Sequence, residues 1–181
     1  MDMTGRLLVS QPTSKSEFFK ESVILLVQHD ERGAWGIQIN KPLDTLSIKD
    51  VITDPEVGIT NDTKCYLGGP VEQQAIHLLH SSDCVMSNSL PITDTLTITS
   101  NATMFKEMEM GRGPSKWICT LGMCTWAPGQ LDGEMRGEHP WTPQHQWLDT
   151  AIPKDLLDRN PRMLWKECVK TCVENATSTF F

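Results

Sequence analysis

Apolar residues gather along the chain in short runs that end at turn-forming residues, a pattern typical of strands. The run at residues 22–30 is apolar nearly throughout, so we expect a strand that is buried on both faces. Pro42 has no amide hydrogen for a strand ladder and is expected to end the strand before it. The full set of predicted strands is 6–10, 22–30, 34–40, 64–69, 95–100 and 116–126.

Helical patterns are fewer, and the clearest lies near the C-terminus. Asn160 can cap this helix and Pro161 suits its first position. Its apolar stripe consists of Trp165, Cys168, Val169, Cys172 and Val173. Shorter helices are predicted at 47–52, 101–110 and 130–135.

The order of these elements indicates the fold class. Strands and helices mingle without a regular strand–helix–strand alternation, which favours an α+β fold on a strongly curved, largely antiparallel sheet. The chain contains neither a repeat nor a linker that would separate two units. We therefore expect a single domain over residues 1–181, with 173–181 as a loose tail.

The segment 71–80 fits two interpretations. Its apolar residues fall at helical spacing, so the local pattern slightly favours a helix, on which His77 and His80 would share one face and could chelate a metal. On a strand the two histidines would point to opposite faces. In either case no further ligands follow at a recognisable spacing, so we expect no metal and no cofactor.

Gly68, Gly69 and Pro70 precede this segment and could form a turn or a phosphate cradle. They lack the spacing of a dinucleotide fingerprint and the lysine of a phosphate loop. Pro70 also lacks the amide hydrogen that a cradle would use. A tight structural turn is the expected outcome.

The net charge of the chain limits the kinds of molecule that it is expected to bind. The chain has 23 acidic and 16 basic residues, for a net charge of −7, which disfavours a broad nucleic-acid surface. Arg162, Lys166 and Lys170 form a basic stripe on the last helix, but acids intersperse it, so we expect a solvated face.

Targeting signals are absent from the N-terminal residues, and no apolar run approaches the roughly 20 residues of a membrane span. We expect a cytoplasmic protein without a membrane partner.

The cysteines show no metal or redox spacing. Cys119 and Cys124, like Cys168 and Cys172, do not form a CxxC pair, so core packing is expected. The sequence leaves a redox role for these four residues open.

The segment 125–135 has the most specific local shape. Trp126, Pro128, Gly129 and Gln130 predict either a structural corner with the indole in the core, or a surface notch that receives a partner. Physical reasoning favours the corner for the indole. We expect the side-chain amide of Gln130 to be available to a partner, and the acids at Glu134 and Glu138 to lie in a surface turn that aids solubility.

Several of these pieces together resemble one family. The runs GRLLVSQP, FFKESVILLVQHDERGAWGIQINKP, YLGGPV and LGMCTWAPGQLDGEM occur in the order and spacing of the YqgE/AlgH family of small bacterial proteins. The resemblance extends from Gly5 to about Trp165. It implies one α+β domain whose sheet bends into a partly open pseudo-barrel with flanking helices. It also implies a strand over the two histidines and a structural Gly-Gly-Pro-Val turn.

The resemblance implies no established molecular activity, although some members are named transcriptional regulators. No GxSxG elbow or helix-turn-helix pattern is present. We therefore expect a non-enzymatic regulatory or adaptor protein that acts through protein contacts, with any effect on transcription indirect. One alternative is an enzyme or small-ligand binder whose notch comprises Gly68, Gly69, Pro70, Trp126, Pro128, Gly129 and Gln130. Another is direct DNA binding through the last helix.

Overall fold

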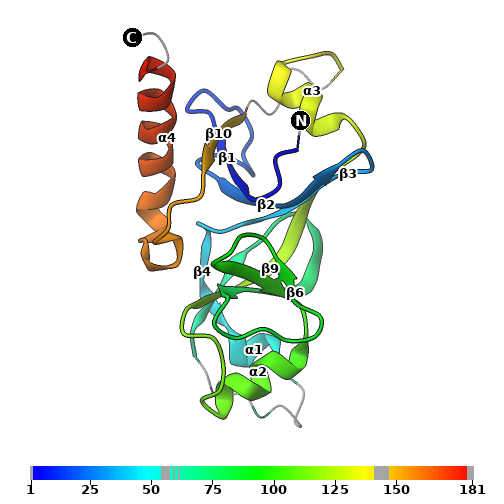
Figure 1. Cartoon of the computed structure of the whole chain (residues 1–181), viewed down its shortest axis with the longest axis vertical. Coiled ribbons are helices and arrows are strands. Elements are labelled where there is room, and N and C mark those ends of the chain that lie inside the picture. Colours follow the sequence, from blue (N-terminus) through cyan, green and yellow to red (C-terminus); the bar gives the residue numbers. More distant parts are fainter. Residues whose placement is uncertain (1, 54–57, 59, 61, 141–146, 179–181) are drawn as a thin grey trace.

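Strands make up most of the computed structural model, which describes residues 2–53, 58, 60, 62–140 and 147–178 (Figure 1). The strands are β1 Arg6–Ser10, β2 Val23–Asp30, β3 Gly33–Gln38, β4 Pro42–Ser47, β5 Lys64–Leu67, β6 Val71–Ser81, β7 Leu90–Pro91, β8 Leu96–Thr99, β9 Trp117–Trp126 and β10 Trp147–Ala151. The helices are α1 Ile48–Val51, α2 Ala102–Glu109, α3 Gln130–Arg136 and α4 Pro161–Ser178, with a 3₁₀ turn, η1, at Leu156–Asp158.

The sheet has the order β10-β1-β2-β3-β9-β6-β8-β7, and β4 and β5 form a side branch. Strand β5 runs parallel to β9, and the other strand pairs of the described chain are antiparallel. Register shifts in β2, between Leu26 and Gln28, and in β6, between Val71 and Ile76, accompany the bending of the sheet. The result is a single α+β domain with a strongly curled antiparallel half-barrel, as predicted.

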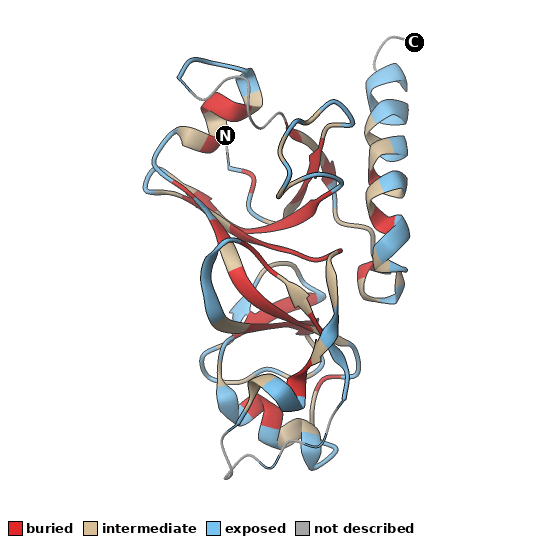
Figure 2. Ribbon diagram, turned by 180° about the vertical axis from the view of Figure 1, so that it is seen from behind, coloured by how far each residue is buried: buried red, intermediate tan, exposed pale blue. Residues whose placement is uncertain are grey.

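The buried residues form three apolar clusters. Figure 2 shows that most of the buried residues lie on the strands of the curled sheet. The largest lies between β1, β2, β3, β6, β8 and α4. A second packs α3 against the N-terminal strands, and a third packs α1 and α2 against β5, β6 and β9. Residues 23–27 of β2 are all buried, which confirms the prediction of a strand covered on both faces.

Helix α4 confirms most of its predicted stripe. Cys168 is buried in the largest cluster, and Trp165, Val169 and Cys172 pack against that cluster. Val173 is 56% exposed and contributes little to the packing. The helix continues to Ser178, and residues 179–181 of the predicted tail lie outside the described residues.

Strand β6 decides between the two interpretations of residues 71–80. The helical interpretation is wrong, and the strand implied by the family resemblance is right. Backbone pairing with β9 on one side and β8 on the other overrides the local helical propensity. The ring of His77 lies 5.8 Å from the ring of Trp35, whereas Nδ1 of His80 lies 2.8 Å from the carbonyl oxygen of Ser81. Burial lowers the pKa of both imidazoles.

The turn between β5 and β6 crosses the backbone of β9 at very short range. A Cβ atom on Gly68 would lie 2.3 Å from the carbonyl oxygen of Gly122, and one on Gly69 would lie 2.1 Å from the carbonyl carbon of Met123. The amide of Gly68 donates to the carbonyl of Leu121 at 2.7 Å. Close backbone approach therefore explains both glycines.

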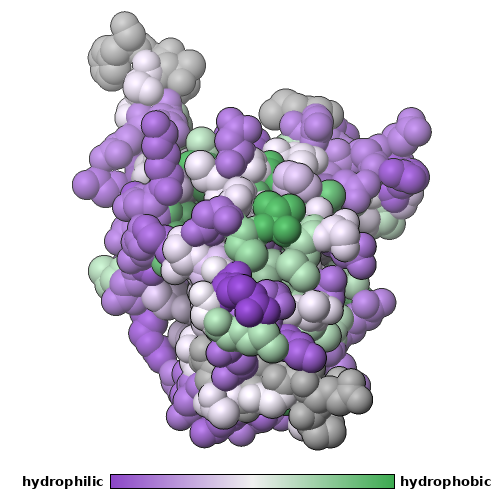
Figure 3. All heavy atoms as spheres, turned by 60° about the horizontal axis from the view of Figure 1, so that its bottom comes forward, coloured by the Kyte–Doolittle hydropathy of each residue, from purple (hydrophilic) through white to green (hydrophobic). Residues whose placement is uncertain are grey.

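Figure 3 shows the residues on one face of the molecule. On the face seen in Figure 3, hydrophilic residues cover most of the area, and a small group of hydrophobic residues lies near its centre. The helices in the described ranges are all too short or too polar to cross a bilayer.

Candidate functional site

The last residue of β9, the first residue of α3 and the three residues between them form the braced turn, which we define as Trp126–Gln130. Trp126 is 7% exposed and packs into the second apolar cluster, so the predicted corner is confirmed for its indole. The next three residues, Ala127, Pro128 and Gly129, are exposed. Gly129 is the N-cap residue of α3 and has φ 73°, a conformation that a residue with a Cβ rarely adopts. The exposed residues Ala127–Gly129, which we call the crest, thus protrude directly after the buried Trp126.

The carboxylate of Glu134 on α3 forms hydrogen bonds with both ends of the braced turn. Its side chain is buried, and Oε2 accepts a hydrogen bond from Nε1 of Trp126 at 3.0 Å and another from Nε1 of Trp147 at 2.9 Å. The prediction that Glu134 lies in a surface turn is therefore wrong. One turn of α3 carries it inward beneath the crest, where the two indole N–H groups satisfy the carboxylate. Glu138, by contrast, is exposed, as predicted, and it also pairs with Arg136.

Gln130 completes the brace. Its Oε1 accepts from the amide of Ala127 at 3.0 Å, and its Nε2 donates to Oε1 of Glu134 at 2.9 Å. That a partner uses this side-chain amide stays a prediction. The structure adds that each of its two ends makes a hydrogen bond within the turn. Spacing alone could not reveal this, since the partner atoms meet only after α3 has formed.

Aromatic contacts add rigidity to the same region. The rings of Trp126 and Trp147 meet edge to face with centroids 6.3 Å apart, and Phe19 meets Trp147 in the same way at 5.4 Å. The brace therefore connects β9, α3 and β10 with the segment before β2. A histidine contact adds to it, since Nε2 of His29 on β2 lies 3.3 Å from Oδ2 of Asp132 on α3.

The two turns proposed as one notch occupy different places on β9. Gly69 of the Gly-Gly-Pro turn, which includes Pro70, lies against Met123 and Cys124, whereas Trp126 pairs with Ala34 of β3. Five surface hollows in the described part of the chain are lined by residues of neither turn. The braced turn is therefore the candidate site by itself.

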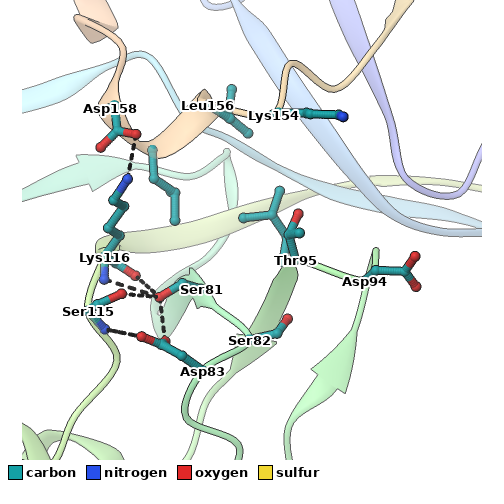
Figure 4. Close-up of a pocket in the computed structure, with 12 residues that line it drawn as sticks. Ser81, Ser82, Asp83, Asp94, Thr95, Ser115, Lys116, Lys154, Leu156 and Asp158 are labelled. Atoms are coloured by element: carbon teal, nitrogen blue, oxygen red, sulfur yellow. Dashed lines mark hydrogen bonds and ion pairs between the residues drawn. The ribbon is translucent and has the colours of Figure 1, made fainter.

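A hollow of about 380 Å³ lies where β6, β8 and β9 approach η1 (Figure 4). Oγ of Ser81 donates to Asp83 at 2.6 Å and lies 3.2 Å from Oγ of Ser115, and Lys116 pairs with Asp158 at 2.6 Å. Figure 4 shows that these bonds run between wall residues. The polar groups on this side of the hollow thus satisfy one another.

The six cysteines are free thiols in this structure, and four of them are buried. Burial raises the pKa of Cys124 to about 12 and that of Cys168 to about 11, so both are protonated at neutral pH. Cys65 lies beside Cys119, with their Sγ atoms 3.8 Å apart on neighbouring parallel strands, and no spacing in the sequence indicated this contact. No group of three or more histidine, cysteine or acidic residues in the described ranges could hold a metal ion.

Comparison with known proteins places this fold in a family. The model of the AlgH-like family matches residues 7–176. The chain belongs to the AlgH-like family. It is 33% identical to a UPF0301 protein of Rhizorhabdus wittichii over 172 residues, which cover 93% of this chain and 89% of that one. A UPF0301 protein of Sphingopyxis alaskensis is 36% identical over 168 residues, which cover 90% and 85%.

Two solved structures have the same fold as this chain. The solution structure of the AlgH protein from Pseudomonas aeruginosa matches with a TM-score of 0.74 and 26% identity, over 92% of this chain and 87% of that one. The crystal structure of protein DIP2367 from Corynebacterium diphtheriae shares the fold, with a TM-score of 0.68. The names of these relatives state no molecular activity, so function has to be argued from the site.

Proposed function

We propose that this AlgH-like protein is a non-enzymatic regulatory or adaptor protein that acts through protein contacts, with the braced turn as its recognition surface. One observation carries the proposal. The exposed crest Ala127–Gly129 stands on a buried carboxylate that is bonded to two indoles and one amide.

A rigid loop binds a partner with a smaller loss of conformational entropy than a flexible one. A loop that is already fixed in one conformation loses little freedom on binding, so more of its contact energy appears as affinity. Burying a carboxylate such as Glu134 is unfavourable unless its hydrogen bonds are satisfied, and such networks can hold a single geometry. In this proposal the network keeps the crest rigid, and the crest offers a partner a small, uncharged protrusion.

The distribution of charge disfavours direct DNA binding, so any effect of this protein on transcription is proposed to be indirect. The net charge of −7 opposes contact with phosphate backbones. Within the basic stripe, Arg162 pairs with Asp44 and Lys170 pairs with Glu174, so acids partly offset its charge. These observations support a protein partner over DNA.

The test places a large charged side chain on the crest. Ala127→Arg keeps the backbone amide that donates to Gln130, and it projects a bulky cation where the partner would dock. Ala176→Arg, on the exposed end of α4, is the matched control. Each tagged variant is used to capture proteins from a lysate of cells that encode it, and a captured protein is then purified and titrated.

We expect a purified partner to bind the wild type and Ala176→Arg equally, and Ala127→Arg at least about tenfold more weakly. Circular dichroism and thermal melting should show that both variants remain folded. A partner that binds Ala127→Arg as tightly as the wild type would exclude the crest as its recognition surface.

A further inference from the structure

A hollow of about 240 Å³ lies where the β3–β4 turn meets the first turns of α4, on the side of the molecule where α4 runs (Figure 1). We call it the basic hollow, and its lining residues are Glu21, Asn40, Lys41, Pro42, Arg162, Trp165 and Lys166. Three cations and one acid give it a formal charge of +2 in a chain whose net charge is −7. The basic hollow is therefore a local group of positive charges in an acidic chain.

The side chain of Asn40 links two backbone segments beside the basic hollow through hydrogen bonds. Oδ1 of Asn40 accepts from the amide of Val23 at 2.8 Å, and its Nδ2 donates to the carbonyl of Glu21 at 2.8 Å. Glu21 has φ 53°, a left-handed conformation that costs energy for a residue with a side chain. The buried amide of Asn40 therefore fixes two adjoining turns in one arrangement.

Lys41 is the least solvated cation of the three. Its Nζ donates to the carbonyl of Lys20 at 2.6 Å, which provides a hydrogen bond but no opposite charge. Burial lowers the pKa of this ammonium, and the neighbouring Glu21 offsets that effect in part. An anion in the basic hollow would compensate this ammonium for the hydration that it has lost.

Helix α4 contributes the other wall. Arg162 and Lys166 are four residues apart, so they lie on one face of the helix. Between them Trp165 is held by a hydrogen bond from its Nε1 to the carbonyl of Ser10 at 2.8 Å. Among the described residues no carboxylate pairs with Lys166. Arg162 bonds Asp44 at 2.7 Å, but both side chains are more than 60% exposed, so solvent screens that pair.

We propose that the basic hollow binds the phosphate group of a small phosphate monoester. In this arrangement Lys41, Arg162 and Lys166 surround the phosphate, and the organic part lies against the ring of Trp165. A monoester has a charge of about −1.5 to −2 near neutral pH, which matches the +2 of the basic hollow, whereas a monocarboxylate neutralises only half of it. The planar guanidinium suits two phosphate oxygens at once. The small volume favours a compact ester over a longer ligand.

The experiment uses phenyl phosphate as the probe, because it combines a phosphate with one flat ring. Titration calorimetry at low ionic strength compares the whole chain with Lys41→Met and Lys166→Met, which keep most of the side-chain bulk. Lys170→Met is the matched control, since it removes the same charge from α4 but Lys170 lies outside the basic hollow. Asp44→Asn removes the carboxylate that competes for Arg162.

We expect each variant of Lys41 and Lys166 to weaken phenyl phosphate at least about tenfold, as the loss of a charge-assisted hydrogen bond does. Lys170→Met should bind within about twofold of the wild type, and Asp44→Asn should bind a few-fold more tightly. Melting curves establish that each variant is folded. The crest variant Ala127→Arg should bind the probe normally, so this proposal and the proposed function can fail separately.

Three results would overturn the proposal. The first is equal binding by the wild type and the Lys41 and Lys166 variants. The second is a similar loss in Lys170→Met, which would mean that only the total charge matters. The third is benzoate binding as tightly as phenyl phosphate, which would leave the dianionic phosphate without a role.

Discussion

Replacement of Glu134 by alanine tests whether the buried brace stabilises the fold. The substitution removes the acceptor of two indole N–H groups, on Trp126 and Trp147, and of one amide on Gln130. Both indoles remain in a buried cluster, where a donor without an acceptor costs about 1–3 kcal/mol. Two such donors cost roughly 2–6 kcal/mol, and relief of the buried carboxylate offsets part of this. We expect a net loss of about 2–5 kcal/mol, a large share of the roughly 5–15 kcal/mol that stabilises a typical domain.

Urea unfolding, followed by tryptophan fluorescence and by circular dichroism, measures this loss. With a slope of about 2 kcal/mol per molar urea, the midpoint should fall by roughly 1–2.5 M. Glu134→Gln should show a smaller fall, because its amide oxygen can still accept from the indoles while its NH₂ group faces the NH₂ group of Gln130. The control is Glu138→Ala, which removes the same charge from an exposed ion pair and should leave the midpoint close to that of the wild type. A Glu134→Ala midpoint that matches this control would refute the reasoning, since the hydrogen bonds would then contribute nothing net.

Three further outcomes follow from the structure. Gly69→Ala should unfold the domain or sharply reduce its soluble yield, because the new Cβ would lie 2.1 Å from the backbone of Met123. In Gly129→Ala the new Cβ meets open space, so a melting experiment should show a loss of only about 1 kcal/mol from backbone strain. Brief native alkylation should label Cys84 and Cys172 first, since the other four thiols are buried, and mass spectrometry that finds early modification of buried thiols would contradict the packing. Random duplex DNA should not bind at physiological salt, given the net charge of −7, and a salt-sensitive gel shift in the micromolar range would revive the DNA alternative.

Elements with a strong local pattern could be predicted from the sequence. Strand β2 is recognisable because burial on both faces leaves an unbroken apolar run, and α4 because a cap and a stripe coincide. Strands β4, β7 and β10 were missed. Strand β4 begins at Pro42, the residue expected to end a strand, and β7 has only two residues. Strand β10 depends on pairing with β1, which lies more than 130 residues earlier in the chain.

The candidate site could be predicted only in part, because some of its contacts join residues that are far apart in the sequence. The residues of the braced turn suggested a rigid shape, and the indole of Trp126 is indeed buried. The role of Glu134 could not be found, because the second indole that satisfies it comes from Trp147 on another strand. The basic hollow was likewise hidden, since Lys41 is more than 100 residues from Arg162 and Lys166 along the chain. Helical spacing revealed only the two residues that share α4.

The crossing at Gly68, Gly69 and Gly122 affects how relatives of this chain should be compared. At each of these positions a side chain would collide with the opposite backbone, so any descendant that keeps the crossing must keep glycine there. Selection at these positions acts on whether the chain can close its sheet, and it is indifferent to what the molecule binds. A shared Gly-Gly-Pro signature is therefore evidence of common architecture alone. Two members can retain it while their crests and charged hollows diverge toward different partners, and those surfaces are where specialisation within the family should be sought.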